Sequence, residues 1–143
     1  MKESYFENDF ITIYIEYGIV FCIYKENVVV SLEFAKAMVD QRLIITQDKV
    51  YPIFADIRGL KYTTKEARQY LKGKGAEGLS AGAFLINSAV QQILGNYFIK
   101  FDRPPIPIRL FTDQGKALQW VQKFKGGSNP IINKSSFGLK VVL

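Results

Sequence analysis

The sequence of 143 residues contains no histidine. Histidine is the most frequent general base and metal ligand of proteins, so its absence removes the usual groups for acid–base and metal-ion catalysis. Cysteine occurs once, as Cys22 within an apolar segment, which excludes an internal disulfide framework and favours a reducing compartment. The acids of residues 51–143 stand singly and are explained as turns or helix caps. We therefore predict a protein that is not an enzyme and that needs neither a cofactor nor a metal.

Long apolar runs and targeting segments are also missing. No stretch approaches the roughly 20 apolar residues of a membrane-spanning helix, and the first ten residues, MKESYFENDF, lack the pattern of a secretory signal. We expect no transmembrane segment and a cytoplasmic location. The length and the 48% apolar content suit one globular domain, which we assign to residues 1–127. Residues 128–143, rich in Asn, Ser and Lys, form a C-terminal tail.

Charge is unevenly distributed along the chain. Residues 1–50 carry five Lys/Arg and eight Asp/Glu, whereas residues 51–143 carry fourteen and five. A basic half can meet nucleic acid, an anionic membrane surface or an acidic partner. No RNA-binding aromatic motif or helix-turn-helix spacing is present, so nucleic acid is not expected as a partner. The glycine-rich stretch 72–78 matches no phosphate-binding loop.

Hydrophobic periodicity predicts an α/β fold. Period-two alternation indicates five strands, at residues 10–17, 19–24, 51–57, 79–86 and 106–111, and residues 28–30 are either a short strand or the start of a helix. Helical spacing indicates four helices, which begin after Ser31, Thr63-Thr64, Ser88 and Asp113. The fold class is therefore a mixed, mostly parallel five-stranded sheet with an N-terminal antiparallel hairpin and four helices. Pro107 places the last strand at an edge.

One face of this sheet is expected to lack a helical cover. Right-handed crossovers between sequential parallel strands put all the intervening helices on the same face. The opposite face would then carry aromatic side chains, namely Tyr14, Tyr24, Phe54, Phe84 and Phe111. Another subunit, the C-terminal tail or a ligand would have to cover that face. We therefore predict a homodimer or a tail-covered sheet.

The helix that follows Ser88 shows the strongest amphipathic pattern. Ser88 and Gln91 have the spacing of a capping box. One apolar stripe, which we expect to face the core, comprises Val90, Ile93, Leu94, Tyr97, Phe98 and Phe101. Phe98 and, in the last helix, Trp120 are predicted to be buried.

The stretch from Tyr51 to Leu71 carries the candidate site. It is interpreted as a buried strand, a turn at Arg58-Gly59, and a helix capped by Thr63 with Glu66. Ligands of open α/β sheets bind beyond the carboxyl ends of the strands, where helix N-termini favour anions. We predict an anion- or partner-binding site at this edge, formed by Arg58, Gly59, Lys61, Thr63, Thr64, Lys65 and Arg68.

Four segments resemble a known family. They read FADIRG (54–59), TTKEARQYL (63–71), GAFLINSAVQQILGNYFIKF (82–101) and IPIRLFTDQGKALQWVQKF (106–124). They look like the SpoIIAA-like group of the STAS superfamily, and more narrowly like a set of uncharacterised bacterial proteins of that group. The resemblance covers residues 10–124 and implies a mixed sheet with helices, no catalytic metal, and a role in protein–protein regulation or apolar-ligand binding. Thr63-Thr64-Lys65-Glu66 replaces the family's phosphorylatable Asp-Ser-Ser-Gly motif, so a phosphorylation switch is not carried over.

Two functions remain open on the sequence alone. The first is a non-catalytic, STAS-like interaction module that self-associates and docks a protein partner through the loop at residues 58–65. The second is a module that binds a small molecule or a lipid with an anionic headgroup, through the aromatic face or a pocket under the last helix. A ligand that co-purifies with the protein would favour the second.

Overall fold

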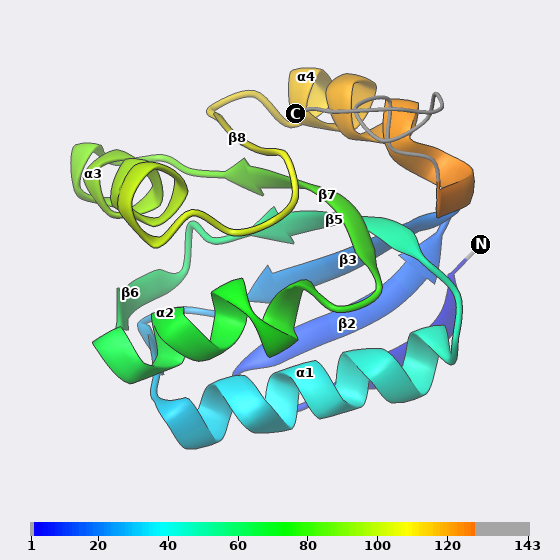
Figure 1. Ribbon diagram of the computed structural model, residues 1–143, viewed down its shortest axis with the longest axis horizontal. Coiled ribbons are helices and arrows are strands. Elements are labelled where there is room, and N and C mark those ends of the chain that lie inside the picture. Colours follow the sequence, from blue (N-terminus) through cyan, green and yellow to red (C-terminus); the bar gives the residue numbers. More distant parts are fainter. Residues whose placement is uncertain (1, 128–143) are drawn as a thin grey trace.

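The computed structural model describes residues 2–127 of the chain and contains a six-stranded mixed sheet (Figure 1). The strands lie in the order β1–β2–β3–β5–β7–β8. Their bounds are β1 (Glu3–Glu7), β2 (Ile11–Glu16), β3 (Ile19–Tyr24), β5 (Tyr51–Asp56), β7 (Leu79–Leu85) and β8 (Ile108–Phe111). The first three strands are antiparallel, and β3, β5, β7 and β8 are parallel.

Residues 2–127 also contain four α-helices and three shorter helical segments, and the last of each kind follows the last strand. The α-helices are α1 (Leu32–Thr46), α2 (Lys65–Lys72), α3 (Ala89–Tyr97) and α4 (Gln114–Val121), and the short segments are η1 (Lys74–Ala76), η2 (Phe98–Asp102) and η3 (Gln122–Gly127). Each α-helix begins after a side-chain cap that accepts a hydrogen bond from a backbone amide in the first turn, from Ser31, Thr64, Ser88 and Asp113. No helix of residues 2–127 is long and apolar enough to cross a membrane.

The predicted fold class is confirmed, with two additional strands, β1 and β6 (Leu60–Thr63), and residues 28–30 form a strand rather than the start of a helix. β1 extends the sheet to six strands by pairing with β2. β4 (Val28–Val30) and β6 form a separate parallel pair at the carboxyl edge of the large sheet. Thr63 is the last residue of β6, so the cap of α2 is Thr64. The Thr64 hydroxyl accepts a hydrogen bond from the backbone amide of Ala67 at 3.1 Å. The predicted capping box of Thr63 with Glu66 is therefore one residue out of register.

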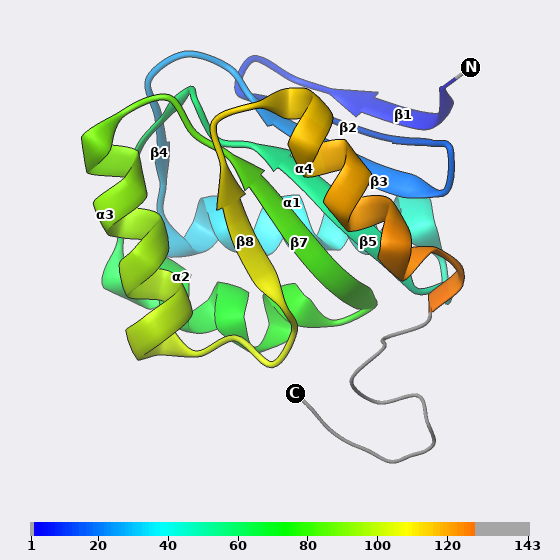
Figure 2. The same cartoon turned by 90° about the horizontal axis from the view of Figure 1, so that it is seen from above.

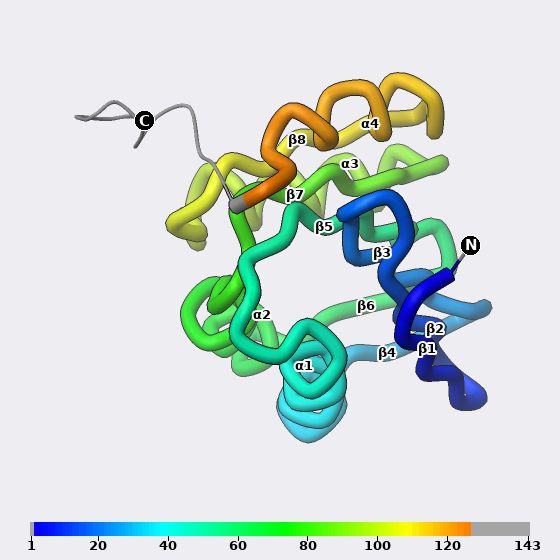
Figure 3. The backbone as a smooth tube through the Cα atoms, turned by 90° about the vertical axis from the view of Figure 1, so that its right-hand side faces the viewer, coloured from blue at the N-terminus to red at the C-terminus, as the bar shows by residue number. Residues whose placement is uncertain are grey.

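Helices cover both faces of the large sheet, as Figures 2 and 3 show. α1, α2 and α3 lie on one face, as the crossover rule predicts. α4 lies on the other, where Ala117 and Val121 pack against Tyr14, Phe21, Phe54 and Leu85. The expectation of a bare aromatic face is therefore wrong: no further strand follows α4 and constrains it to the first face. The predicted homodimer itself is not tested by this arrangement.

The aromatic residues divide between the two faces. Phe54 is in the cluster under α4 and Phe111 packs against it, whereas Tyr24 and Phe84 pack against buried residues on the opposite face. β8 lies at one edge of the sheet, as Pro107 indicates, and Pro107 itself precedes the strand.

The apolar stripe of α3 faces solvent over most of its length, contrary to the prediction. The side chains of Val90, Ile93, Tyr97 and Phe101 are between 46% and 70% exposed. Only Leu94 and Phe98 turn partly inward, and Phe98 stacks on Phe84 with ring centroids 6.4 Å apart. Phe98 and Trp120 are thus half-buried rather than fully buried. α3 contacts the sheet through Gly95, which lies against Leu110 and leaves no space for a Cβ.

Candidate functional site

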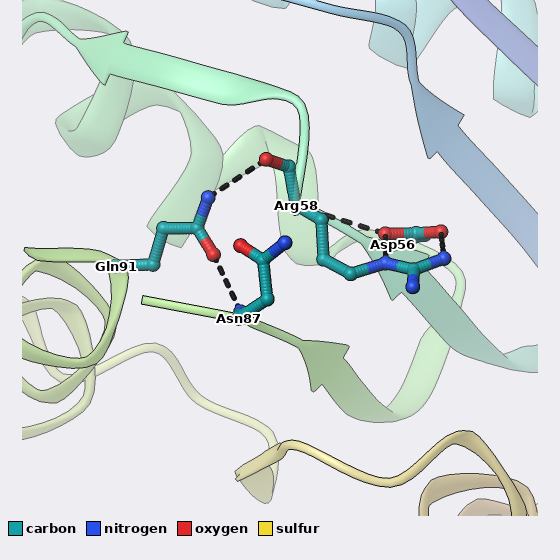
Figure 4. A network of polar contacts seen from close by, with 4 residues as sticks. All are labelled: Asp56, Arg58, Asn87 and Gln91. Carbon is teal, nitrogen blue, oxygen red and sulfur yellow. Dashed lines mark hydrogen bonds and ion pairs between the residues drawn. The ribbon is translucent and has the colours of Figure 1, made fainter. Parts of the chain in front are cut away.

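The loop after β5 is held in place by an internal ion pair. Arg58 Nε donates to Oδ1 of Asp56 at 2.9 Å and its Nη2 donates to Oδ2 at 2.7 Å, a two-pronged arrangement visible in Figure 4. The backbone amide of Arg58 also donates to Asp56 Oδ1, at 3.2 Å. These hydrogen bonds and the charge of Asp56 raise the pKa of Arg58. The arginine that was expected to meet an external anion therefore has a carboxylate partner within the chain.

Gln91 ties this loop to the start of α3. Its Nε2 donates to the carbonyl of Arg58 at 2.8 Å, and its Oε1 accepts from the backbone amide of Asn87 at 2.8 Å (Figure 4). The hydroxyl of Ser88 accepts from the amide of Gln91 at 3.1 Å, so half of the predicted capping box is present. The Gln91 side chain joins two loops at the carboxyl edge of the sheet.

Gly59 is the residue of this loop whose backbone lies against the backbone of Lys25. A Cβ built on Gly59 would lie 1.7 Å from the carbonyl oxygen of Lys25. On the other side of the turn, the carbonyl of Gly59 accepts from the amide of Val28 at 2.9 Å, which starts the pairing of β4 with β6. Only glycine fits at this position.

The remaining predicted site residues divide between solvent and interior. Lys61 and Lys65 are exposed, and Thr64 caps α2. Arg68 Nε donates to the buried Asp102 at 2.9 Å, and Gln69 donates to the other oxygen of that carboxylate at 3.0 Å. Thr63 and Arg68 line an internal cavity, whereas Arg58, Gly59, Lys61, Thr64 and Lys65 do not. Because two of the four cations already bind carboxylates, the predicted anion or partner site at this loop stays a prediction.

An apolar cavity of about 150 Å³ lies between the sheet and the layer formed by α1, α2 and α3. Its ceiling consists of residues that lie in register across the strands: Ile13, Cys22, Ala55 and Phe84 in one row, and Ile53, Gly82 and Ile108 in the next. Its walls include Met38 and Val39 of α1, Leu71 of α2, and Leu94 and Phe98 of α3 and η2. The cavity is thus a composite of every element on this face.

Small residues create the space. Gly82 lies in the middle of the ceiling, where an added Cβ would meet side chains of Phe84, Ile53 and Ile108 at 3.3–3.5 Å. Ala55, Gly75 and Ala76 occupy other positions in the lining. One signal of this feature is visible in the sequence, namely the small residues of the strand at 79–86. We expected them to admit a helix closely, and Ala83 does so beneath α4.

Two cationic side chains line this apolar cavity, Arg42 and Arg68. The sequence analysis assigned no role to Arg42, and the structure buries it to 4% exposure. Desolvation lowers the pKa of Arg42 to about 10, against the opposing effects of Cys22 and Glu77, so the guanidinium remains charged at neutral pH. The signal that could have identified it is a charged residue four positions after Met38 on the buried helix face.

The described residues offer little reactive chemistry. They contain no group of three or more Cys, Asp or Glu side chains that could hold a metal ion. Burial raises the pKa of the Cys22 thiol to about 12, against a smaller lowering by Arg42, so the reactive thiolate is scarce at neutral pH. The Cys22 sulfur instead contacts the Met38 sulfur at 3.9 Å.

Comparisons with known proteins agree with this fold. A family model described as "Domain of unknown function (DUF7793)" matches residues 13–125. A crystal structure of an uncharacterised protein of the DUF3478 family from Shewanella loihica PV-4, with a SpoIIAA-like fold, is similar to the chain with a TM-score of 0.56 and 16% sequence identity. The similarity covers 81% of this chain and 98% of that one, and at this identity it shows the fold alone. No curated protein matches the chain.

Proposed function

The chain belongs to the DUF7793 family, a family of domains of unknown function, and from this premise we propose that it is a non-catalytic module that binds a small apolar molecule in the cavity beneath its sheet. The observation that carries the proposal is the cavity itself, about 150 Å³ in volume and lined almost entirely by apolar side chains. An apolar cavity of this size accepts a molecule as large as benzene.

Energetics favour an occupant. An empty cavity destabilises a protein by about 24 cal/mol per Å³, which for 150 Å³ amounts to about 3–4 kcal/mol. That is a large fraction of a domain stability of about 5–15 kcal/mol. A larger apolar side chain at Ala55 or Ala76 would fill the space, yet the chain carries alanine at both positions. A bound apolar molecule would restore the contacts that the lining atoms lack.

We propose α2 as the wall that opens. Ala67 is its one fully buried residue, and Tyr70 and Leu71 pack partly buried against the core. It is attached to η2 mainly through Asp102, which accepts from Arg68 and Gln69. Segments with few buried contacts open locally at low free-energy cost. Displacement of α2 from η2 would give a ligand access to the cavity between Arg68 and Phe98.

The test is binding of benzene and toluene to the purified protein, measured by thermal shift and by titration calorimetry. Free ligand at about 100 times its dissociation constant should add about 2.7 kcal/mol to the free energy of unfolding. Ala55→Leu fills the ceiling of the cavity and should abolish binding while the protein stays folded. Ala37→Leu, on the exposed side of α1, is the matched control and should bind normally. Absence of any response in the wild-type protein would contradict the proposal.

Self-association is a second candidate, favoured by the exposed stripe on α3 and η2. Val90, Ile93, Tyr97 and Phe101 follow one another on one helix face and are all exposed. Large contiguous apolar surfaces on soluble domains mark interaction sites. We commit to a second copy of the chain as the occupant, because two such stripes can pack face to face in a symmetric helix pair.

Sedimentation velocity tests this candidate directly. The wild-type chain should form a dimer that buries at least about 1,000 Å² in total. Ile93→Asp should give a monomer with unchanged thermal stability, because the side chain is 69% exposed in the single chain. Gln92→Asp, at the neighbouring exposed position, should remain dimeric. A monomeric wild type at all concentrations would exclude self-association through α3.

A further inference from the structure

One charged side chain lies inside the apolar cavity without a carboxylate beside it. Arg42 projects from the buried face of α1, is 4% exposed and lines the cavity. Its Nη1 donates to the carbonyl of Glu77 at 2.9 Å, and its Nη2 donates to the carbonyl of Gly75 at 2.9 Å. These bonds account for two of the five N–H groups that a guanidinium offers. They orient Arg42 without neutralising its charge.

No acidic side chain of the described residues forms an ion pair with Arg42. The charge of Glu77 acts on Arg42, but the ion pair of this carboxylate is with Lys74, at 2.8 Å. Within residues 2–127, no other carboxylate forms an ion pair with Arg42, and residues 128–143 contain no Asp or Glu. Arg68, the second cation of the lining, differs in this respect because it is paired with Asp102 at 2.9 Å. Arg42 is therefore the cation of the cavity lining that forms no ion pair with a carboxylate of residues 2–127.

A buried charge is costly unless it is paired, and most buried charges in proteins have a partner of opposite sign. A guanidinium in apolar surroundings binds a carboxylate through short, parallel, charge-assisted hydrogen bonds. The position of Arg42 in the cavity wall places this donor next to the space for an apolar molecule. One molecule with an apolar body and an anionic group would fill the apolar space and also bind the guanidinium of Arg42.

We propose that the ligand of the cavity is an apolar carboxylic acid, with a body of about one aromatic ring and a carboxylate held by Arg42. This inference rests on the proposed function and specifies its ligand class. The cavity volume of about 150 Å³ sets the size of the body. A singly charged carboxylate suits the site better than a phosphate, because moving a doubly charged group out of water costs more.

The test compares phenylacetate with phenylacetamide, which has the same shape and no charge. In the wild-type protein, phenylacetate should bind about 10- to 100-fold more tightly, as expected for hydrogen bonds to a charged group. Arg42→Met should reduce phenylacetate to the affinity of the amide. Lys36→Met is the matched control, because it removes a positive charge from an exposed position of the same helix outside the cavity lining, and it should keep the preference for the acid.

Arg42→Met also removes two hydrogen bonds to loop carbonyls, so its folding has to be checked by circular dichroism. If it does not fold, the wild-type protein still decides the question through the side-chain Nε–H resonances of its arginines. The resonance assigned to Arg42 by comparison with Arg42→Lys should shift with phenylacetate and not with phenylacetamide.

The outcomes separate the two proposals. Equal affinities for acid and amide in the wild type would overturn the role of Arg42 and leave the cavity as an apolar binding site. A preference that survives in a folded Arg42→Met protein would also overturn it. Binding of neither phenylacetate nor phenylacetamide, together with no response to benzene, would contradict the proposed function, and the inference would fall with it.

Discussion

Two polar side chains, Arg42 and Thr46, lie one helical turn apart on the buried face of α1, and they differ in their hydrogen bonding. Arg42 donates to two carbonyls of the segment that joins α2 to β7. The hydroxyl of Thr46, at 1% exposure, has no hydrogen-bond partner among the described residues. An unsatisfied buried polar group lowers stability by about 1–3 kcal/mol. At the scale of single residues, Thr46 is therefore a weak point of an otherwise well-packed helix.

Thr46→Val should raise the free energy of unfolding by about 1 kcal/mol, since the change keeps the branched shape and removes the unpartnered hydroxyl. Urea titration monitored by circular dichroism would measure it. Ser80→Ala provides the contrast: its hydroxyl donates to the carbonyl of Phe124 at 3.0 Å, so its loss should destabilise by a similar amount. Destabilisation by Thr46→Val would show that the hydroxyl is satisfied in solution.

The buried thiol of Cys22 predicts a loss of stability at alkaline pH. In the unfolded chain the thiol titrates near its ordinary pKa of 9.0, whereas burial raises the pKa in the folded protein to about 12. Above pH 9 the unfolded state therefore binds fewer protons than the folded state, and the free energy of unfolding falls. The contribution of this group should decrease by about 1.4 kcal/mol between pH 8 and pH 10.

Tyrosines and lysines titrate in the same range, so the measurement is the difference between wild type and Cys22→Ala. Denaturant titrations at pH 8 and pH 10 should show the larger decrease in the wild type. Identical decreases in the two proteins would mean that Cys22 ionises equally in both states. Native protein at pH 8 should also react slowly with a thiol reagent, because the thiolate is the reactive form.

At the scale of elements, the contact between Gly59 and Lys25 joins the carboxyl ends of β3 and β5 to the small β4–β6 pair. Gly59→Ala should destabilise the protein by about 3 kcal/mol or more, because its Cβ would overlap a backbone oxygen that cannot rotate away. Gly73→Ala is the control, since its Cβ would meet only ordinary contacts at 3.8 Å or more, and it should change stability by less than about 1 kcal/mol. Thermal unfolding would compare the two, and equal stabilities would show that the loop has moved.

Elements with a clear period could be predicted from the sequence. The alternation around Ile13 and the small, apolar residues from Leu79 specify strands, and the hydroxyl caps Ser31 and Ser88 specify the starts of α1 and α3. β4 and β6 have three and four residues, too few to show a period, and they are stabilised by each other rather than by local preference. β1 escaped prediction because its residues are largely exposed.

The side of α3 that contacts the sheet, and the cavity beneath the sheet, could not be predicted from periodicity. The stripe of α3 has a core-like spacing, but contact with the sheet is made by Gly95 on another side of the helix. The cavity depends on which small residues of separate elements lie opposite each other, as Ala55 and Gly75 do in the lining. The predicted anion or partner site stays a prediction. Two of its residues, Thr63 and Arg68, line the cavity, and so does Arg42, which the sequence did not single out.

At the scale of the whole molecule, the two faces of the sheet are protected unequally. Three helices cover one face, and α4 with the η3 segment covers the other. Val121→Asp places a charge at a fully buried position of that single helix, so α4 should detach and uncover Tyr14, Phe21 and Phe54. The expected result is strong binding of a hydrophobic dye with most strand signal retained. Gln119→Asp, at an exposed position of the same helix, should bind no more dye than wild type.

The cavity beneath the other face should make the protein sensitive to hydrostatic pressure. The volume decrease on unfolding, about 20–100 mL/mol in proteins, scales with the internal void that unfolding eliminates, and a space of about 150 Å³ per molecule corresponds to about 90 mL per mole. Compression should therefore unfold the empty protein at moderate pressure, and a molecule that fills the void should raise the midpoint pressure. Pressure would report occupancy of the cavity in any preparation of the protein, before the chemical identity of the occupant is known.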